Sequence, residues 1–156
     1  MALVIDSQAA DATSRLTGIR LAVLTTRMME LWRRGTRDAD TAMIMVAVAA
    51  ITAERFTRGG LREEQKTLDW AMPLEKLAPC NVSSIAAATG LNRETARRRV
   101  NQLVKSGALI RSENGEIAFP PGRMQDPATA VLVRKQLEAV TRFVNEALKD
   151  GALRVE

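Results

Sequence analysis

Apolar residues recur at helical spacing along most of the chain, in blocks that glycine and proline separate. In the first block the apolar positions are three or four residues apart, at Leu21, Leu24, Met28 and Leu31. They predict an amphipathic helix within residues 16–37, which Gly35 brings to an end. Residues 1–15 have no such spacing, so we expect them to form a flexible N-terminal tail.

The second block predicts a helix that is buried on nearly every side. Asp38 or Asp40 can cap its first turn, and the pair Gly59-Gly60 follows its end at Arg58. Between them, Met43–Ile51 is apolar almost all round, which is typical of a helix surrounded by protein. Residues 60–79 follow with weak periodicity and two prolines, so we expect a connector there.

Residues 82–106 predict a short helix, a tight turn and a second helix. Ser83 or Ser84 can cap the first helix, which ends at Gly90. The second helix covers residues 92–106, with Asn92 as its N-cap and Gly107 following its last residue. Its apolar stripe consists of Ala96, Val100, Leu103 and Val104. This stripe predicts one buried face and leaves the opposite face to charged residues.

A β-hairpin and a long helix complete the predicted layout. Short strands at residues 108–112 and 116–119 flank Asn114-Gly115, a pair that favours a type I′ turn. The last helix is predicted within residues 123–156, with Asp126 as its N-cap and Pro127 in its first turn. Its apolar stripe recurs every three or four residues, at Val133, Leu137, Val140, Val144 and Ala147.

Charge distinguishes one part of this layout. The formal net charge is +5, and residues 80–125 contribute +4 of it through seven basic and three acidic groups. Four arginines and a lysine lie in residues 92–106, where Glu94 is the one acid. A basic face on a short helix favours a polyanionic partner, whereas a solvated helix surface is the common alternative for such a run.

The composition argues against several kinds of chemistry. The chain has no histidine, which is the commonest general base and metal ligand near neutral pH. Its single cysteine, Cys80, excludes an internal disulfide, and no phosphate loop or nucleophile motif is present. We therefore expect no enzyme, no cofactor and no metal. Because no signal peptide or membrane-length apolar run is visible, we also expect a cytoplasmic protein.

A family resemblance lies in residues 83–111. The residues that carry it are Ile85-Ala86, Gly90, Leu91, Thr95-Ala96-Arg97-Arg98, Val100, Leu103, Gly107 and Leu109-Ile110. In these positions the chain resembles the DNA-binding segment of bacterial winged helix-turn-helix regulators of the GntR, MarR and Crp-like families. The resemblance implies a mainly α fold with a small β-hairpin wing. A winged helix-turn-helix over residues 38–122 would then be flanked by N- and C-terminal helices.

The resemblance also implies which residues meet DNA. Residues 92–106 would be a recognition helix in the major groove, where arginine pairs with guanine and asparagine with adenine. Arg97 and Arg98 are the principal expected contacts, followed by Glu94, Thr95 and Asn101. On either side of these contacts, we expect four residues to reach the DNA phosphate backbone: Arg93, Arg111, Ser83 and Ser84.

Two features depart from the family pattern. Arg99 occupies a position that is usually apolar, at the edge of the buried stripe, so we expect it to have a structural or backbone-directed role. At the hairpin tip, Glu113 and Glu116 replace the basic residues that such wings usually carry. The acidic tip argues against insertion of the wing into the minor groove, because carboxylates and phosphates repel each other.

The resulting hypothesis is a sequence-specific, double-stranded DNA-binding transcriptional regulator. We expect a homodimer formed through the helices of residues 16–37 and 123–156, because one winged domain has little room to bury both apolar stripes. A small-molecule effector is left open, since methionines such as Met28, Met43 and Met72 can line a pocket, although core filling is their commoner role. The alternative is a winged-helix module that binds protein and not specific DNA.

Overall fold

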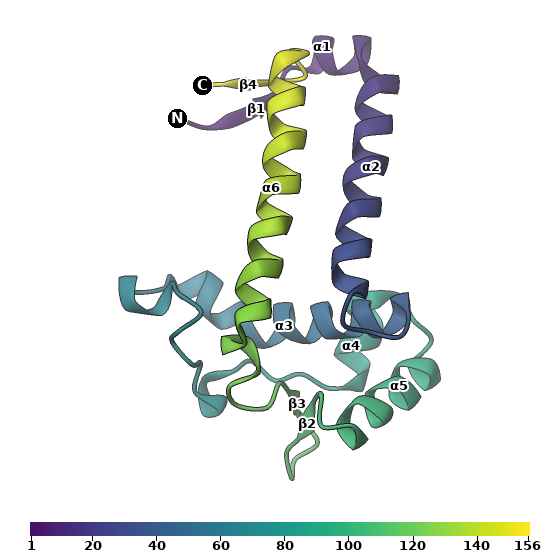
Figure 1. The fold of residues 1–156 in the computed structure, drawn as a ribbon, viewed down its shortest axis with the longest axis vertical. Helices are drawn as coiled ribbons and strands as arrows, with labels where there is room; N and C mark the ends of the chain where they lie inside the picture. Colours follow the sequence, from purple (N-terminus) through teal and green to yellow (C-terminus); the bar gives the residue numbers. More distant parts are fainter. The chain divides into compact units, whose positions relative to one another are not determined.

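The computed structural model describes residues 1–156 and is mainly helical, with 64% of the residues in helices. Two small antiparallel sheets, each of two strands, account for the regular β-structure. The chain divides into two compact units, and Figure 1 labels the helices and strands of which they consist. Residues 1–34 and 131–156 form what we call the terminal unit, and residues 35–130 form the central unit. The central unit is thus an insertion between the two halves of the terminal unit.

The terminal unit contains two long helices that run in opposite directions (Figure 1). They are α2 (Ser14–Arg33) and α6 (Pro127–Lys149), of which α6 begins in the central unit. Residues 1–15, expected to be a flexible tail, instead form β1 (Leu3–Ile5) and α1 (Ser7–Ala12). Strand β1 pairs with β4 (Leu153–Val155), at the far end of the sequence. Local periodicity cannot reveal such a pairing, because its hydrogen bonds come from a distant segment.

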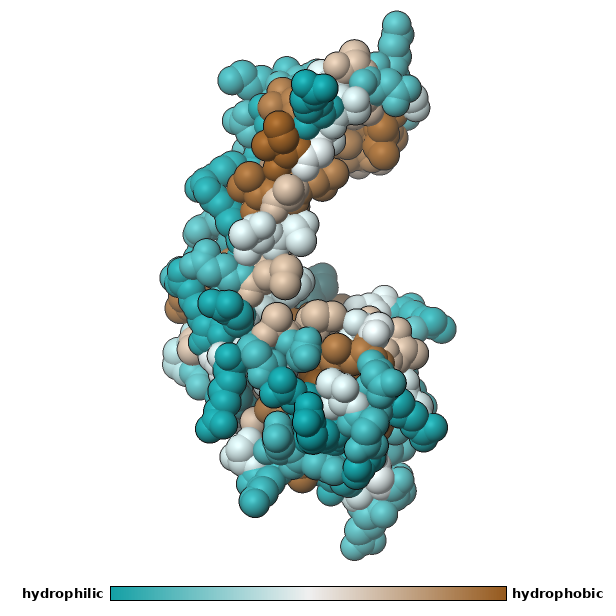
Figure 2. Space-filling model, turned by 90° about the vertical axis from the view of Figure 1, so that its right-hand side faces the viewer, coloured by the Kyte–Doolittle hydropathy of each residue, from teal (hydrophilic) through white to brown (hydrophobic).

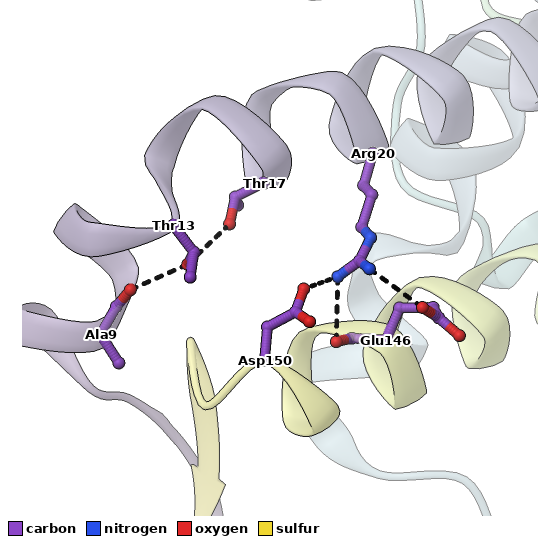
Figure 3. Close-up of polar contacts among 6 residues, drawn as sticks. All are labelled: Ala9, Thr13, Thr17, Arg20, Glu146 and Asp150. Carbon is purple, nitrogen blue, oxygen red and sulfur yellow. Dashed lines mark hydrogen bonds and ion pairs between the residues drawn. The ribbon is translucent and has the colours of Figure 1, made fainter.

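Arg20 links α2 to the last turn of α6 (Figure 3). Its Nη1 donates to the Glu146 carbonyl at 3.0 Å, and its Nη2 donates to Glu146 Oε2 at 3.0 Å. The same guanidinium also forms an ion pair with Asp150. A cation at the carboxyl end of a helix is favourably placed, because the carbonyl groups there carry partial negative charge.

The long helices of the terminal unit bury few side chains. No residue of α2 is buried, and Ala147 is the single buried residue of α6. Figure 2 shows hydrophobic residues gathered on the surface of this unit, in the upper part of the view. The most exposed large apolar side chains on the two helices are Ile19 (57%), Val131 (52%) and Leu137 (64%).

The central unit is built around α3 (Ala39–Gly59), which contributes Ile44 and Val48 to the core. The other elements are α4 (Val82–Thr89), α5 (Arg93–Lys105) and a hairpin of β2 (Ile110–Arg111) and β3 (Ile117–Ala118). The core is completed by Ile85 of α4, Val100 of α5 and Ile117 of β3, and by Cys80 and Leu109, which lie just before α4 and β2. The predicted burial of α3 holds for one face, whereas Ala50 on another face is exposed.

Helix α4 begins differently from the expectation that Ser83 or Ser84 caps it. Asn81 is the N-cap: its Oδ1 accepts from Ser84 N at 3.0 Å, and Ser84 Oγ accepts from Asn81 N at 2.9 Å. This reciprocal pair satisfies two backbone donors that the first helical turn would otherwise leave unpaired. Ser84 therefore occupies the third helical position and Ser83 the second.

The hairpin has shorter strands than predicted, and its turn is not type I′. A type I′ turn needs positive φ at both central residues, but Gly115 alone has one here, at 84°. Gly115 N donates to Ser112 O at 2.9 Å, and Ser112 N donates to Glu116 O at 2.9 Å, which closes a three-residue loop. Within the loop, the side-chain Oδ1 of Asn114 accepts a hydrogen bond from Ser112 Oγ. A turn with a left-handed glycine at its end is the usual form of this loop length.

The connector of residues 60–79 contains two single-turn helices, Glu63–Gln65 and Leu74–Lys76. Trp70 anchors the connector to α3 by an edge-to-face contact with Phe56, with ring centroids 5.8 Å apart.

None of the helices in the structure combines the length and the apolar character that crossing a membrane requires.

Candidate nucleic-acid interface

Helix α5 has the two faces that its sequence predicts. Ala96 and Val100 are fully buried, whereas Arg97 and Arg98 are exposed. The start of the helix is fixed by Asn92, whose Oδ1 accepts from Glu94 N at 2.9 Å. Its end is fixed by Gly107, which takes the left-handed conformation at a φ of 75°. The charged face is therefore held outward by a defined register, because the buried stripe cannot rotate without exposing apolar surface.

A hollow of about 530 Å³ lies between the first turn of α4, the exposed face of α5 and the hairpin. Five of the predicted DNA-binding residues line it: Ser83, Arg93, Arg97, Asn101 and Arg111. No acidic residue is among those lining it. Three guanidinium groups around one concave surface make it a place where an anion is favoured.

Two hydrogen-bonded pairs organise the polar residues around this hollow. Glu94 holds Arg97 in a two-pronged contact, with Arg97 Nε to Glu94 Oε2 at 2.9 Å and Arg97 Nη2 to Glu94 Oε1 at 2.6 Å. The hydrogen bond from Arg97 lowers the pKa of Glu94, and the same bond raises the pKa of Arg97. Arg111, at the base of the hairpin, donates to Asn101 Oδ1 at 2.7 Å and so joins the hairpin to α5.

The remaining predicted residues lie in different surroundings. Arg98 is exposed, does not line the hollow, and forms no hydrogen bond or ion pair within the chain, so its guanidinium can meet a partner without first losing one. Thr95 is half-buried. The hydroxyl of Ser84 donates to Asn81 O at 2.8 Å while accepting from Asn81 N, which gives it a capping role.

Arg99 has the structural position that its place at the core edge predicted. Its Nη1 contacts Asp38 Oδ2 at 2.7 Å, and each side chain is about a third exposed or less, at 27% and 33%. Asp38 is also the N-cap of α3, since its Oδ1 accepts from Thr41 N at 2.8 Å. The Thr41 backbone N–H lowers the pKa of Asp38 most, and Arg99 lowers it further. No local pattern predicts that the N-cap of α3 also holds an arginine of α5, because the two residues are 61 positions apart.

No group of three histidine, cysteine, aspartate or glutamate side chains is arranged to hold a metal ion. Comparisons of the chain with known protein families, with curated proteins and with solved structures found no match.

Proposed function

We propose that the chain is a sequence-specific, double-stranded DNA-binding transcriptional regulator, in which α4, α5 and the β2–β3 hairpin act as a winged helix-turn-helix. The observation that carries the proposal is the basic hollow, which gathers Arg93, Arg97 and Arg111 beside the exposed face of α5. Helix α5 has 13 residues. It is therefore about 20 Å long at 1.5 Å per residue, a suitable size for the major groove.

The proposed contacts divide by position. Arg98, with no partner in the chain, is the residue best placed to read a base. Arg93 and Arg111, which line the hollow, supply phosphate contacts that set the position of the helix. Arg97 reads a base only after its pairing with Glu94 loosens, so its contribution includes the cost of that exchange.

Selection of bound duplexes from a random pool tests this proposal directly. Enrichment of a common sequence supports it, and the enriched duplex then serves for affinity measurements against salt. Each phosphate contact adds about 0.9 to the magnitude of the slope of log K against log salt, so the two proposed contacts, from Arg93 and Arg111, predict a slope of about −2 per bound chain. A slope near zero together with no enriched sequence would overturn the DNA proposal.

The alternative, a winged-helix module that binds protein, has one observation in its favour. Glu113 and Glu116 are exposed at the hairpin, beside the basic hollow, and they repel phosphate. The same salt titration separates the two functions, because binding to protein need not release the counterions that duplex DNA carries.

We further propose that the protein is a homodimer through α2 and α6. Helix α2 has apolar residues on two sides. Leu24, Met28 and Leu31 are half-buried within the chain, whereas Leu16, Ile19 and Val23 are exposed. At about 100° per residue, the second set occupies its own face of the helix, away from the first. A second copy is the occupant that this face favours, because it brings an equal apolar surface.

Sedimentation of the pure protein at micromolar concentration tests the dimer without reference to DNA. A mass near 34 kDa, twice the 17.1 kDa of the chain, is expected. A single species of 17.1 kDa would overturn the dimer but would leave the DNA proposal standing.

A further inference from the structure

The central unit contains a second hollow, separate from the basic one and different in character. It has a volume of about 220 Å³ and lies between α3, the connector and the segment that follows β3. Residues from all three parts line it, including Ala49, Thr52, Trp70, Leu77, Phe119 and Met124. Of the methionines considered above for an effector pocket, Met72 borders it, whereas Met28 and Met43 do not.

The walls of this cavity are mainly apolar and offer no unpaired charge. Lys66 is the one charged residue among them, and it forms an ion pair with Glu63. Thr52 Oγ1 donates to Val48 O at 2.7 Å, so this hydroxyl proton is already used. Gln125 Nε2 donates to Leu68 O at 2.8 Å and holds one wall in place. The side-chain oxygen of Gln125 and the indole N–H of Trp70 form no hydrogen bond within the chain.

The size of the cavity limits what it can hold. The space of about 220 Å³ is several times the volume that one water molecule occupies, so it has room for a small organic molecule. A dry engineered cavity of about 150 Å³ takes benzene, and drug-sized ligands occupy about 300 Å³ or more. The present volume falls between these values. Leu74, which is 43% exposed, borders the cavity and gives it an edge at the solvent.

We propose that this cavity is a binding site for a small, uncharged, mainly apolar molecule about the size of one substituted ring. The apolar walls receive the ring, and Trp70 N–H or Gln125 Oε1 can pair with one polar substituent. A charged ligand is disfavoured, because it would lose its water without gaining an opposite charge. The proposal concerns the central unit alone and does not depend on DNA binding.

The segments that enclose the cavity continue directly to the basic hollow. Leu77 lines the cavity, and the next residue, Ala78, donates its N–H to Thr52 O on α3 at 2.9 Å. Two residues further, Cys80 O accepts from Ile117 N of β3 at 2.7 Å. Phe119 directly follows β3, at the end of the hairpin away from its turn, and it both lines the cavity and packs against the core. A bound ring therefore braces the connector against α3 and the hairpin.

Trp70 makes the binding measurable by fluorescence. Trp32→Phe removes the other tryptophan, which lies in the terminal unit, so that the emission reports Trp70. We expect benzyl alcohol and toluene to change this emission with saturation. Benzoate, with the same ring and a negative charge, should bind at least about ten-fold more weakly, because its carboxylate must be desolvated.

A pair of neighbouring substitutions provides the control. Ala49→Met fills the cavity from α3 and should abolish the saturable change, whereas Ala50→Met, at an exposed position outside the cavity, should preserve it. If Ala49→Met does not fold, backbone amide shifts of the unsubstituted chain on adding benzyl alcohol decide the question, since Thr52 and Phe119 should move most. Shifts confined to the terminal unit, equal binding of benzoate, or no saturable response to either neutral probe would overturn the proposal.

Discussion

Removing the Arg99 side chain should loosen α5 from the start of α3 without unfolding either helix. Arg99 and Asp38 are 27% and 33% exposed, so solvent screens their attraction in part. Exposed ion pairs contribute about 0.2–1 kcal/mol, and we place this pair at the upper end of that range, near 1 kcal/mol, because it is partly covered. Arg99→Ala should therefore lower the free energy of unfolding of the central unit by about 1 kcal/mol.

The cap function of Asp38 must be separated from its ion pair. Asp38→Asn keeps an N-cap acceptor for Thr41 N, since asparagine caps about as well as aspartate, and it removes the charge. This variant should also lose about 1 kcal/mol, and the double variant should lose no more than either single one. Arg98→Ala is the matched control: this neighbour has no partner, so its change should stay within about 0.5 kcal/mol.

Urea unfolding followed by Trp70 emission, in the Trp32→Phe background, measures these free energies. Losses in the double variant that equal the sum of the two single losses would refute the pairing. The pH supplies a second check. The folded pKa of Asp38 is lowered, so its contribution is complete at pH 6 and is lost as pH falls through and below its ordinary value of 3.8. The difference between the unsubstituted chain and Asp38→Asn should therefore disappear in acid.

Three further substitutions test the proposed interface and dimer. Arg98→Ala should cost about 1–3 kcal/mol on the selected duplex and relax specificity at one base pair, measured by binding to single-base variants; equal loss on random duplex would make Arg98 a phosphate contact. Glu94→Gln should strengthen binding to random duplex, because it removes an acid and frees Arg97, and an unchanged affinity in anisotropy titrations would contradict this role. Leu137→Glu should raise the dimer dissociation constant at least about 100-fold, from about 3 kcal/mol of lost burial over two copies. Lys135→Glu, about 160° away around α6, should leave sedimentation unchanged.

The sequence predicted the helices well where their signals were local. The spacing of apolar residues located α3, α5 and α6, and Asp126 begins α6 as expected, with its Oδ1 accepting from Ala128 N at 2.9 Å. Caps were less secure: Asn81, Ser83 and Ser84 are all good cap residues within four positions, so composition alone could not choose among them. The structure chose Asn81, the position at which the backbone is still extended.

The parts that were missed depend on contacts between distant segments. The pairing of β1 with β4 joins the first and last residues described, and neither strand has the length to show an alternating pattern. The basic hollow is likewise assembled from three elements, although its arginines could be named from the sequence. The pairings Glu94–Arg97 and Asn101–Arg111 required side-chain conformations that no sequence pattern specifies.

The insertion of the central unit within the terminal unit has a consequence for folding during synthesis. The central unit is one continuous stretch of the chain, so it can fold once residues 35–130 have left the ribosome. Helix α2, by contrast, is made first and must wait for Glu146 and Asp150 before Arg20 finds its partners. Until residues 131–156 are made, the terminal unit lacks one of its two halves. Of the two long helices, α2 thus spends longer without its ion-pair partners, because the partners on and after α6 are made later.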